Sequence, residues 1–197
     1  MKILIGTNNK NKLAQYRQTL EKDSNNLEIL SLADVGITLD VEEDGDNLLY
    51  NAKKKAKEYA ELSGMVTIAD DTGLFIDALG GEPGIHAKRW AAGSDRDRCL
   101  KIIERLRDVP ADERKARYEA IVACYDPARK KFFISKSEVR GYIVDEIKGY
   151  NGFGYDSIFL VEKFGKRFAE LTEEEIDSIS HRAIGTKKIL IKLIRND

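Results

Sequence analysis

The chain has 197 residues, of which 42% are hydrophobic and 34% are charged, with 33 basic against 34 acidic side chains. This length suits one sizeable domain, and the balanced charge argues against a general nucleic-acid-binding or membrane-surface protein. Cys99 and Cys124 both lie in apolar contexts and are expected to be buried free thiols. No stretch has the roughly 18 apolar residues of a membrane span, and the apolar run at the N-terminus is too short for a signal peptide. We therefore expect a cytoplasmic protein.

The hydrophobic periodicity predicts interleaved strands and helices. A turn is expected at Asp126–Pro127, between two long strands, so the sheet should be mixed rather than purely parallel. In chain order we expect strands over 2–6, 27–32, 65–69, 73–79, 118–126, 131–144 and 158–161. A first helix is expected over about 13–20, with Leu13, Tyr16 and Leu20 on its apolar face, and a second over 46–62, with Asp46 as its N-cap and its end before Gly64. Two more helices are expected, one after the N-cap Ser94 and one from about Ser180.

The polar loop after the first strand, TNNKNK, is a candidate anion site. A strand that leads through a polar loop into a helix presents backbone N–H groups and the positive end of the helix dipole. The loop is not a P-loop, because the glycine spacing and the Gly-Lys-Ser/Thr ending are missing. An ordinary capped loop with solvated lysines is the alternative. The candidate phosphate-binding residues are Thr7, Asn8, Asn9, Lys10, Asn11 and Lys12.

The helix expected over 46–62 places a lysine beside its apolar face. At about 100° per residue, the apolar face comprises Leu48, Leu49, Ala52, Ala56 and Tyr59. Lys55 lies at the edge of this face, so it must either reach water or meet a buried anion. The preceding acidic loop, residues 42–44, is either a solvated turn or a source of oxygen ligands for a hard cation.

Two adjacent acids, Asp70 and Asp71, follow the apolar run 65–69, where we expect the strand to end. Neighbouring side chains of a strand point to opposite faces, so one carboxylate can face a cleft while the other is held by backbone donors. Carboxylates combined with substrate phosphates suit Mg²⁺, and one of them can activate water. The alternative is a capping turn, because Asp-Thr-Gly is good turn chemistry.

Two later segments are weaker candidates. The loop NGFGYDS, residues 151–157, has glycines that allow a close backbone approach to a ligand and aromatic rings that can stack. His181 and Arg182 lie where the last helix begins and can donate hydrogen bonds to a base or a phosphate. His86 is assigned a structural role.

Taken together and in order, these segments resemble the inosine triphosphate pyrophosphatase family over nearly the whole chain. The similar motifs are TNNKNK, EEDGDNLLYNAKKKA, ADDTGL, LGGEPGIHAKR, GFGYD and SHR. The resemblance implies a single nucleoside triphosphate pyrophosphatase domain over 1–197. Its implied fold is an α/β one with a long central mixed sheet, flanked by helices and forming two lobes around an active-site cleft. It further implies hydrolysis of ITP, dITP and XTP to the monophosphate and pyrophosphate, with Mg²⁺ as the cofactor and a homodimer as the assembly. No nucleic-acid or membrane partner is expected.

The resemblance also implies residue roles. Asp71 would be the catalytic acid–base, Lys55 would lie close to the reacting phosphates, and Glu43 would help Asp71 to hold Mg²⁺, with Asp70 in support. The substrate-binding residues would be those of the phosphate loop 7–12 with Thr72, Arg89, Phe153, Gly154, Tyr155, Asp156, His181 and Arg182.

Four positions depart from the family's pattern. Tyr50, His86 and Ser157 replace a glutamate, a tyrosine and a proline, and Ile176 stands where many members carry a substrate-contacting lysine. An apolar side chain cannot replace a cationic donor. Two alternatives therefore stay open: a pyrophosphatase of the same fold with a shifted nucleotide specificity, and a nucleotide-binding protein with reduced turnover.

Overall fold

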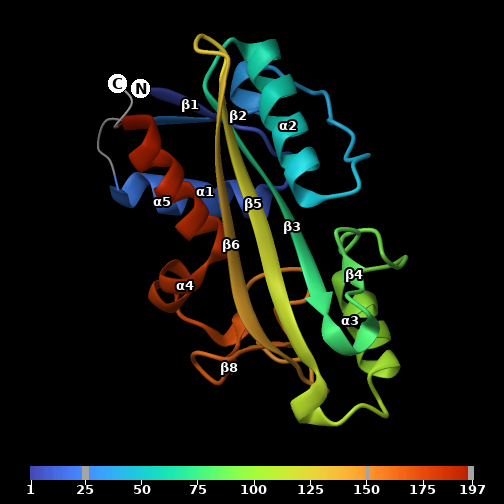
Figure 1. The fold of residues 1–197 in the computed structure, drawn as a ribbon. Helices are drawn as coiled ribbons and strands as arrows, with labels where there is room; N and C mark the ends of the chain where they lie inside the picture. Colours follow the sequence, from blue (N-terminus) through green and yellow to red (C-terminus); the bar gives the residue numbers. More distant parts are fainter. Residues whose placement is uncertain (24–26, 150, 195–197) are drawn as a thin grey trace. The chain divides into compact units, whose positions relative to one another are not determined.

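The computed structural model describes residues 1–23, 27–149 and 151–194 (Figure 1). The helices are α1 (Lys10–Asp23), α2 (Leu48–Ser63), α3 (Asp95–Arg105), α4 (Glu173–Ile179) and α5 (His181–Ile194). The strands are β1 (Lys2–Ile5), β2 (Glu28–Ser31), β3 (Thr67–Ile76), β4 (Pro83–Gly84), β5 (Lys115–Asp126), β6 (Lys131–Ile143), β7 (Phe159–Val161) and β8 (Lys166–Arg167). No helix in these ranges is long and apolar enough to cross a membrane.

The strands form one eight-stranded sheet in the order β2-β1-β3-β5-β6-β7-β8, with β4 paired to β3. Strand β1 is parallel to both β2 and β3, whereas β7 is antiparallel to β6 and to β8. The predicted α/β fold with a mixed sheet is therefore confirmed. The expected turn between β5 and β6 is also present, over residues 127–130.

The chain divides into two compact units. The first comprises the described residues of 1–72, 120–137 and 181–197, and the second comprises those of 73–119 and 138–180. Each unit has its own apolar core, built in the second unit around Ile102, Ile158 and Phe159. That the two units form one functional domain stays a prediction.

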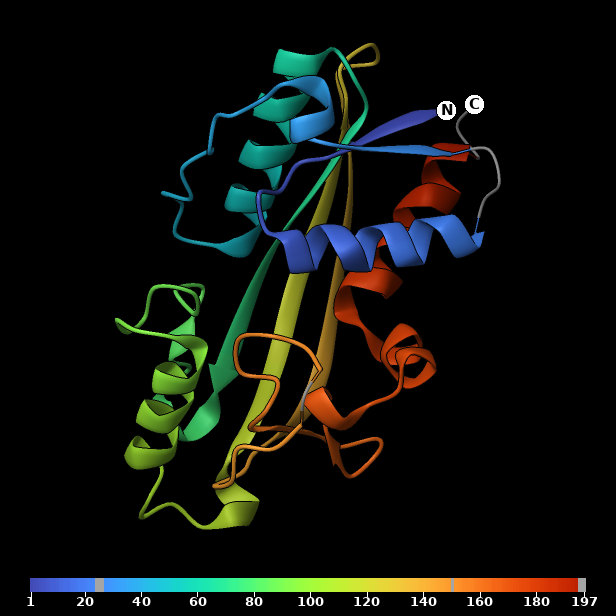
Figure 2. The same ribbon diagram turned by 180° about the vertical axis from the view of Figure 1, so that it is seen from behind.

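In the first unit, helices cover both faces of the sheet. Ile3 and Ile5 of β1 pack in one core cluster with Tyr16 of α1 and with residues of α5, and α1 packs against α5 (Figure 2). Leu4 packs in a separate cluster with Tyr59 of α2. Because side chains alternate along a strand, α1 and α5 lie on one face of β1 and α2 lies on the other.

The acidic pair lies inside a strand, not at its end. Strand β3 runs without interruption over Thr67–Ile76, so the prediction of two separate extended segments over 65–69 and 73–79 was wrong. Two adjacent carboxylates are tolerated within a strand because their side chains point to opposite faces. Each face supplies its own cationic partners, as described below.

The ends of α2 were predicted to within two residues. The N-cap is Asn47, whose side chain accepts a hydrogen bond from the backbone N–H of Tyr50 at 2.8 Å, and not Asp46 as predicted. The side chain of Asp46 instead accepts a hydrogen bond from the Asn47 amide. Gly64 ends the helix as expected, with a φ of 70° that glycine adopts without strain.

The buried face of α2 agrees with the predicted face except at Leu49, which is 44% exposed. A helical wheel carries no information on where packing stops along the helix axis, and Leu49 lies in the first turn. The buried residues are Leu48, Asn51, Ala52, Lys55, Ala56, Tyr59 and Ala60. Two polar side chains, Asn51 and Lys55, therefore lie among the apolar ones.

Removal of the cap of α3 is expected to destabilise the second unit. Ser94 is the predicted N-cap, and it forms a reciprocal capping box with Asp97. We expect Ser94→Ala to lower the free energy of unfolding by about 1 kcal/mol, because a first-turn N–H loses its partner. Chemical denaturation measures this change. Ser178→Ala is the matched control: the Ser178 hydroxyl only donates back to the carbonyl of Glu175 within α4, so its loss should change little.

Candidate functional site

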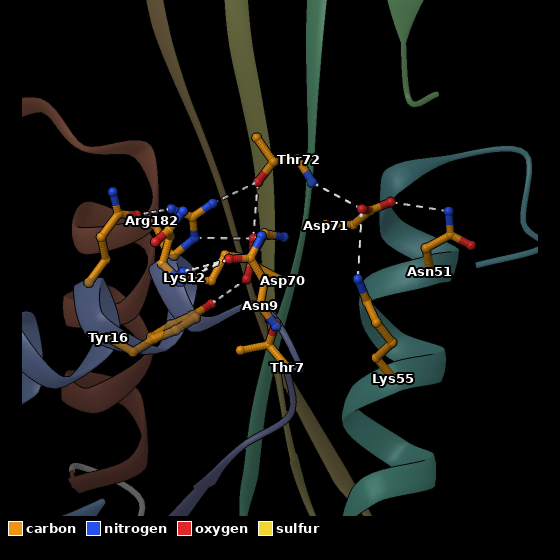
Figure 3. Close-up of polar contacts among 12 residues, drawn as sticks. Thr7, Asn9, Lys12, Tyr16, Asn51, Lys55, Asp70, Asp71, Thr72 and Arg182 are labelled. Atoms are coloured by element: carbon orange, nitrogen blue, oxygen red, sulfur yellow. Dashed lines mark hydrogen bonds and ion pairs between the residues drawn. The ribbon is translucent and has the colours of Figure 1, made fainter. Parts of the chain in front are cut away.

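The two acids of β3 point to opposite faces of the sheet in the first unit and have different surroundings there. Figure 3 shows Asp70 pointing towards α1 and α5, whereas Asp71 points towards α2. Both side chains are buried, Asp70 at 2% and Asp71 at 5% exposure. A buried carboxylate needs charged or hydrogen-bonding partners, and the two acids obtain different ones.

The Asp70 carboxylate is surrounded by four donors. Its Oδ2 accepts hydrogen bonds from Lys12 Nζ at 2.8 Å, Thr72 Oγ1 at 3.0 Å and Arg182 Nε at 3.2 Å, while its Oδ1 accepts one from Tyr16 at 3.1 Å. Burial by itself raises the pKa of Asp70, but the charges of Arg182, Lys12 and the nearby Lys55 hold it well below its ordinary value of 3.8. Asp70 is therefore ionised and holds two cations in place.

The Asp71 carboxylate has fewer partners. Its Oδ2 accepts a hydrogen bond from Asn51 Nδ2 at 3.1 Å, and its Oδ1 accepts one from the backbone N–H of Thr72 at 3.1 Å. The Nζ of Lys55 lies 3.7 Å from Oδ1. Burial raises the pKa of Asp71, and although Lys55 opposes this rise, the charge of Glu43 adds to it. A raised pKa makes Asp71 a stronger base than an ordinary carboxylate.

Lys55 links Asp71 to the acidic loop. Its ammonium group pairs with Glu43 as well as with Asp71 (Figure 3 shows the Asp71 contact). Burial by itself lowers the pKa of Lys55, but the charges of Asp71, Glu43 and Asp70 raise it above the ordinary value. The lysine at the edge of the apolar face thus contacts a buried anion, Asp71, which was one of its two predicted outcomes, and also the half-buried Glu43.

The predicted phosphate loop is a capped turn into α1. The side chain of Thr7 accepts a hydrogen bond from the backbone N–H of Asn9, and the side chain of Asn9 accepts from the backbone N–H groups of Asn11 and Lys12. Asn8, Lys10 and Asn11 are exposed. Of the two lysines, Lys12 contacts Asp70. A phosphate-binding role for the loop stays a prediction, and its capping role is shown.

The acids on the α2 face suit a hard cation. Asp71 and Glu43 both form ion pairs with Lys55 Nζ, so the two carboxylates lie close to each other. Mg²⁺ usually takes one or two carboxylates and completes its shell with waters and substrate phosphates, so this pair fits it. The oxygens of Asp70 are already engaged by four donors. In the described part of the chain, no group of three or more Asp, Glu, His or Cys side chains is arranged to hold a metal ion.

Five predicted substrate-binding residues belong to the second unit. Arg89 is exposed, and Phe153 and Gly154 are half-buried. Tyr155 donates its hydroxyl to the carbonyl of Ala87 at 2.7 Å, and Asp156 accepts from the hydroxyl of Tyr118 at 3.0 Å. Both side chains therefore hold the loop to its own unit. Of His181 the structure describes only its place at the start of α5.

Three residues of the first unit escaped the sequence analysis. Tyr16 was predicted to be apolar packing, but its hydroxyl also donates to Asp70. Gln15 accepts a hydrogen bond from the guanidinium of Arg182. Asn51 lies one helical turn before Lys55 on the buried face of α2, and this position, read together with Lys55, was a detectable signal.

The described structure is that of an α/β protein with a mixed sheet, in which the buried carboxylate of Asp71 contacts Lys55 and a capped polar loop leads into α1. Within this class, the chain belongs to the Ham1 family, whose sequence model matches residues 3–192. The predicted family resemblance is thereby confirmed.

Individual relatives agree with this assignment. A dITP/XTP pyrophosphatase of Thermoanaerobacter sp. (strain X514) is 39% identical over 191 residues, which are 96% of this chain and 94% of the relative. The solved structure of the Staphylococcus aureus Ham1 protein is 31% identical and superposes with a TM-score of 0.85 over 100% of both chains. A nucleoside-triphosphatase / dITP/XTP pyrophosphatase from Mycobacterium abscessus is 35% identical, with a TM-score of 0.73 over 93% of this chain and 96% of that one.

Proposed function

We propose that this protein hydrolyses non-standard purine nucleoside triphosphates, namely ITP, dITP and XTP, to the nucleoside monophosphate and pyrophosphate. The observation that carries the proposal is Asp71, a buried carboxylate of raised pKa in contact with Lys55, which also holds Glu43. The pyrophosphatase activity for which its relatives are named supports the same reaction. Such an enzyme removes damaged purines from the nucleotide pool.

The chain's own residues supply a base and positive charge. Asp71 accepts the proton of the attacking water. The water oxygen forms a bond to the α-phosphorus, the bond from this phosphorus to the oxygen that bridges to the β-phosphate breaks, and pyrophosphate leaves. Lys55 stabilises the negative charge that develops on the phosphate oxygens, because a fixed cation in a buried site acts more strongly than one in water. The loop 7–12 and Thr72 are proposed to contact the triphosphate.

Glu43 and Asp71 are the residues that would hold Mg²⁺. When bound, this ion supplies additional positive charge to the phosphate oxygens. Asp70 was predicted as a third metal-associated residue; we propose that it acts by holding Lys12 and Arg182 in place. Six residues are proposed to contact the base and sugar: Phe153, Gly154, Tyr155, Asp156, His181 and Arg182. Arg89 is proposed as a further substrate-binding residue. A cytoplasmic homodimer is part of the same proposal.

A nucleotide panel tests the reaction and the substrate together. We expect pyrophosphate release from ITP, dITP and XTP, because donors that bind a 6-oxo group leave the 6-amino group of adenine unpaired. Release should stop on chelation of divalent cations and return on addition of Mg²⁺. Pyrophosphate and orthophosphate are measured separately, and ATP and dATP serve as controls.

The panel also decides between the remaining alternatives. Release of orthophosphate alone would overturn the proposed bond cleavage, and turnover of another nucleotide but not of these three would indicate a shifted specificity. Ile176, which motivates both alternatives, is half-buried and packs against the core of the second unit. Binding of ITP without any hydrolysis would indicate a nucleotide-binding protein.

A further inference from the structure

Asn51 is a buried amide whose two ends are both engaged. It lies in the first turn of α2, four residues after the N-cap Asn47, and is 2% exposed. Its Oδ1 accepts a hydrogen bond from the backbone N–H of Gly45 at 2.9 Å, and its Nδ2 donates to Asp71 Oδ2 at 3.1 Å. One neutral side chain thus joins Gly45, the residue after the acidic loop 42–44, to Asp71 (Figure 3 shows the contact with Asp71).

Successive turns of α2 hold the acidic loop. Lys55 pairs with Glu43. One turn further on, the hydroxyl of Tyr59 accepts from the backbone N–H of Val41 at 3.1 Å and lies 3.3 Å from the carbonyl of Leu39. Asn51 continues this row one turn towards the start of the helix, because residues four apart share a helix face. The loop is therefore held along its length and not at one point.

The approach of the loop to Asn51 is close enough to require glycine at position 45. A Cβ on Gly45 would lie 2.6 Å from Asn51 Oδ1 and 2.2 Å from Cδ1 of Tyr50. Any other residue would therefore push the loop away from the amide. This close fit distinguishes the contact from a chance surface hydrogen bond.

Asn51 and Lys55 both bridge the loop and Asp71, but by different means. Lys55 does so with a charge, which the proposed function assigns to the phosphates. Asn51 does so with a planar amide, whose donor and acceptor have fixed directions. The amide joins the backbone at Gly45, two residues after Glu43, to the carboxylate of Asp71.

We propose that Asn51 is a positioning residue that sets the placement of Glu43 relative to Asp71, and thereby the geometry of the cation and base site. The inference rests on the proposed function for its effect on turnover. Its structural part, the link between the loop and Asp71, can be measured without substrate.

Two substitutions test the hydrogen bonds that Asn51 forms with Gly45 and with Asp71. Asn51→Leu keeps the branched arrangement of the side chain's heavy atoms and removes both hydrogen bonds. Asn51→Asp keeps an acceptor for Gly45 but replaces the donor to Asp71 with a second carboxylate. The matched control is Asn47→Asp, the same change on the same helix at the exposed N-cap, where aspartate caps as well as asparagine does.

We expect kcat to fall about 10- to 100-fold in both Asn51 variants, as is typical when a group that orients a metal-site residue is lost, while KM for dITP changes less. The affinity for Mn²⁺, measured by electron paramagnetic resonance without nucleotide, should fall about tenfold in Asn51→Leu. Hydrogen exchange of the Gly45 amide should accelerate in Asn51→Leu and stay near the parent rate in Asn51→Asp. Asn47→Asp should match the parent protein throughout.

A purely structural role would lower the melting temperature of Asn51→Leu and leave kcat per folded molecule and Mn²⁺ affinity unchanged, and that result would overturn the inference. If Asn51→Leu does not fold, Asn51→Asp decides, and parent-like kcat in that variant overturns the inference. If the parent protein itself releases no pyrophosphate, the proposed function fails, and Mn²⁺ affinity and Gly45 exchange still decide the role of Asn51.

Discussion

Replacement of Asp71 by asparagine is expected to remove nearly all pyrophosphate release while the protein remains folded. Asparagine keeps the shape of the side chain but cannot accept a proton from water. General base catalysis contributes about 10²- to 10⁴-fold, so we expect a loss of kcat in this range. The parent hydrogen bond from Thr72 N can still form to the amide oxygen, which is why the fold should persist.

Pyrophosphate release from dITP at saturating Mg²⁺ measures the effect, and circular dichroism confirms folding. Asp112→Asn, at an exposed position in the second unit, is the control and should leave turnover unchanged. If Asp71→Asn keeps more than a tenth of the parent kcat, Asp71 is not the general base and the proposed mechanism is wrong.

The corresponding substitution at the neighbouring position, Asp70→Asn, is expected to lower the stability of the folded protein. Asp70→Asn removes a buried charge and leaves the cations of Lys12 and Arg182 without their anion. Removal of one partner from a buried ion pair costs about 3–5 kcal/mol. We therefore expect the free energy of unfolding at neutral pH to fall by about this amount, as measured by chemical denaturation.

A pH series gives this prediction a second signature. The pKa of Asp70 is held below its ordinary value of 3.8 in the folded protein. The Asp70 carboxylate therefore binds a proton more readily in the unfolded chain than in the folded one. Asp70 contributes its full stabilisation when the pH is above the ordinary pKa of the carboxyl. This stabilisation is lost as the pH falls towards the lower pKa that Asp70 has in the folded protein. The stability gap between the parent protein and Asp70→Asn should therefore narrow in acid. Equal stability at neutral pH would show that the charge of Asp70 is not needed.

Much of the fold follows from local patterns. The turn at Asp126–Pro127, the Ser94 cap and the Gly64 end of α2 were predictable because turns and caps depend on a few adjacent residues. The short helix α4 was missed. The break predicted after residue 69 was wrong because a strand that is covered on both faces can carry two adjacent acids, and coverage is a tertiary property.

The sequence by itself determined the family, the order of the motifs and the chemical groups of the candidate site. Lys55 was identified from its place on the helical wheel, and Asp70 and Asp71 from their place after an apolar run. Lys55 does contact a buried anion, Asp71. Alternation along a strand also implied that the two acids face opposite ways.

Only the tertiary structure decided which acid faces which helix. Asp70 meets Arg182 across 112 residues of sequence and Lys12 across 58, whereas Asp71 meets Asn51 across 20. Periodicity describes each element alone and is silent on which elements lie against each face of the sheet. The different roles proposed for the two acids follow from this packing. The charges of Arg182, Lys12 and Lys55 lower the pKa of Asp70. Burial and the charge of Glu43 raise the pKa of Asp71 in spite of the nearby lysines.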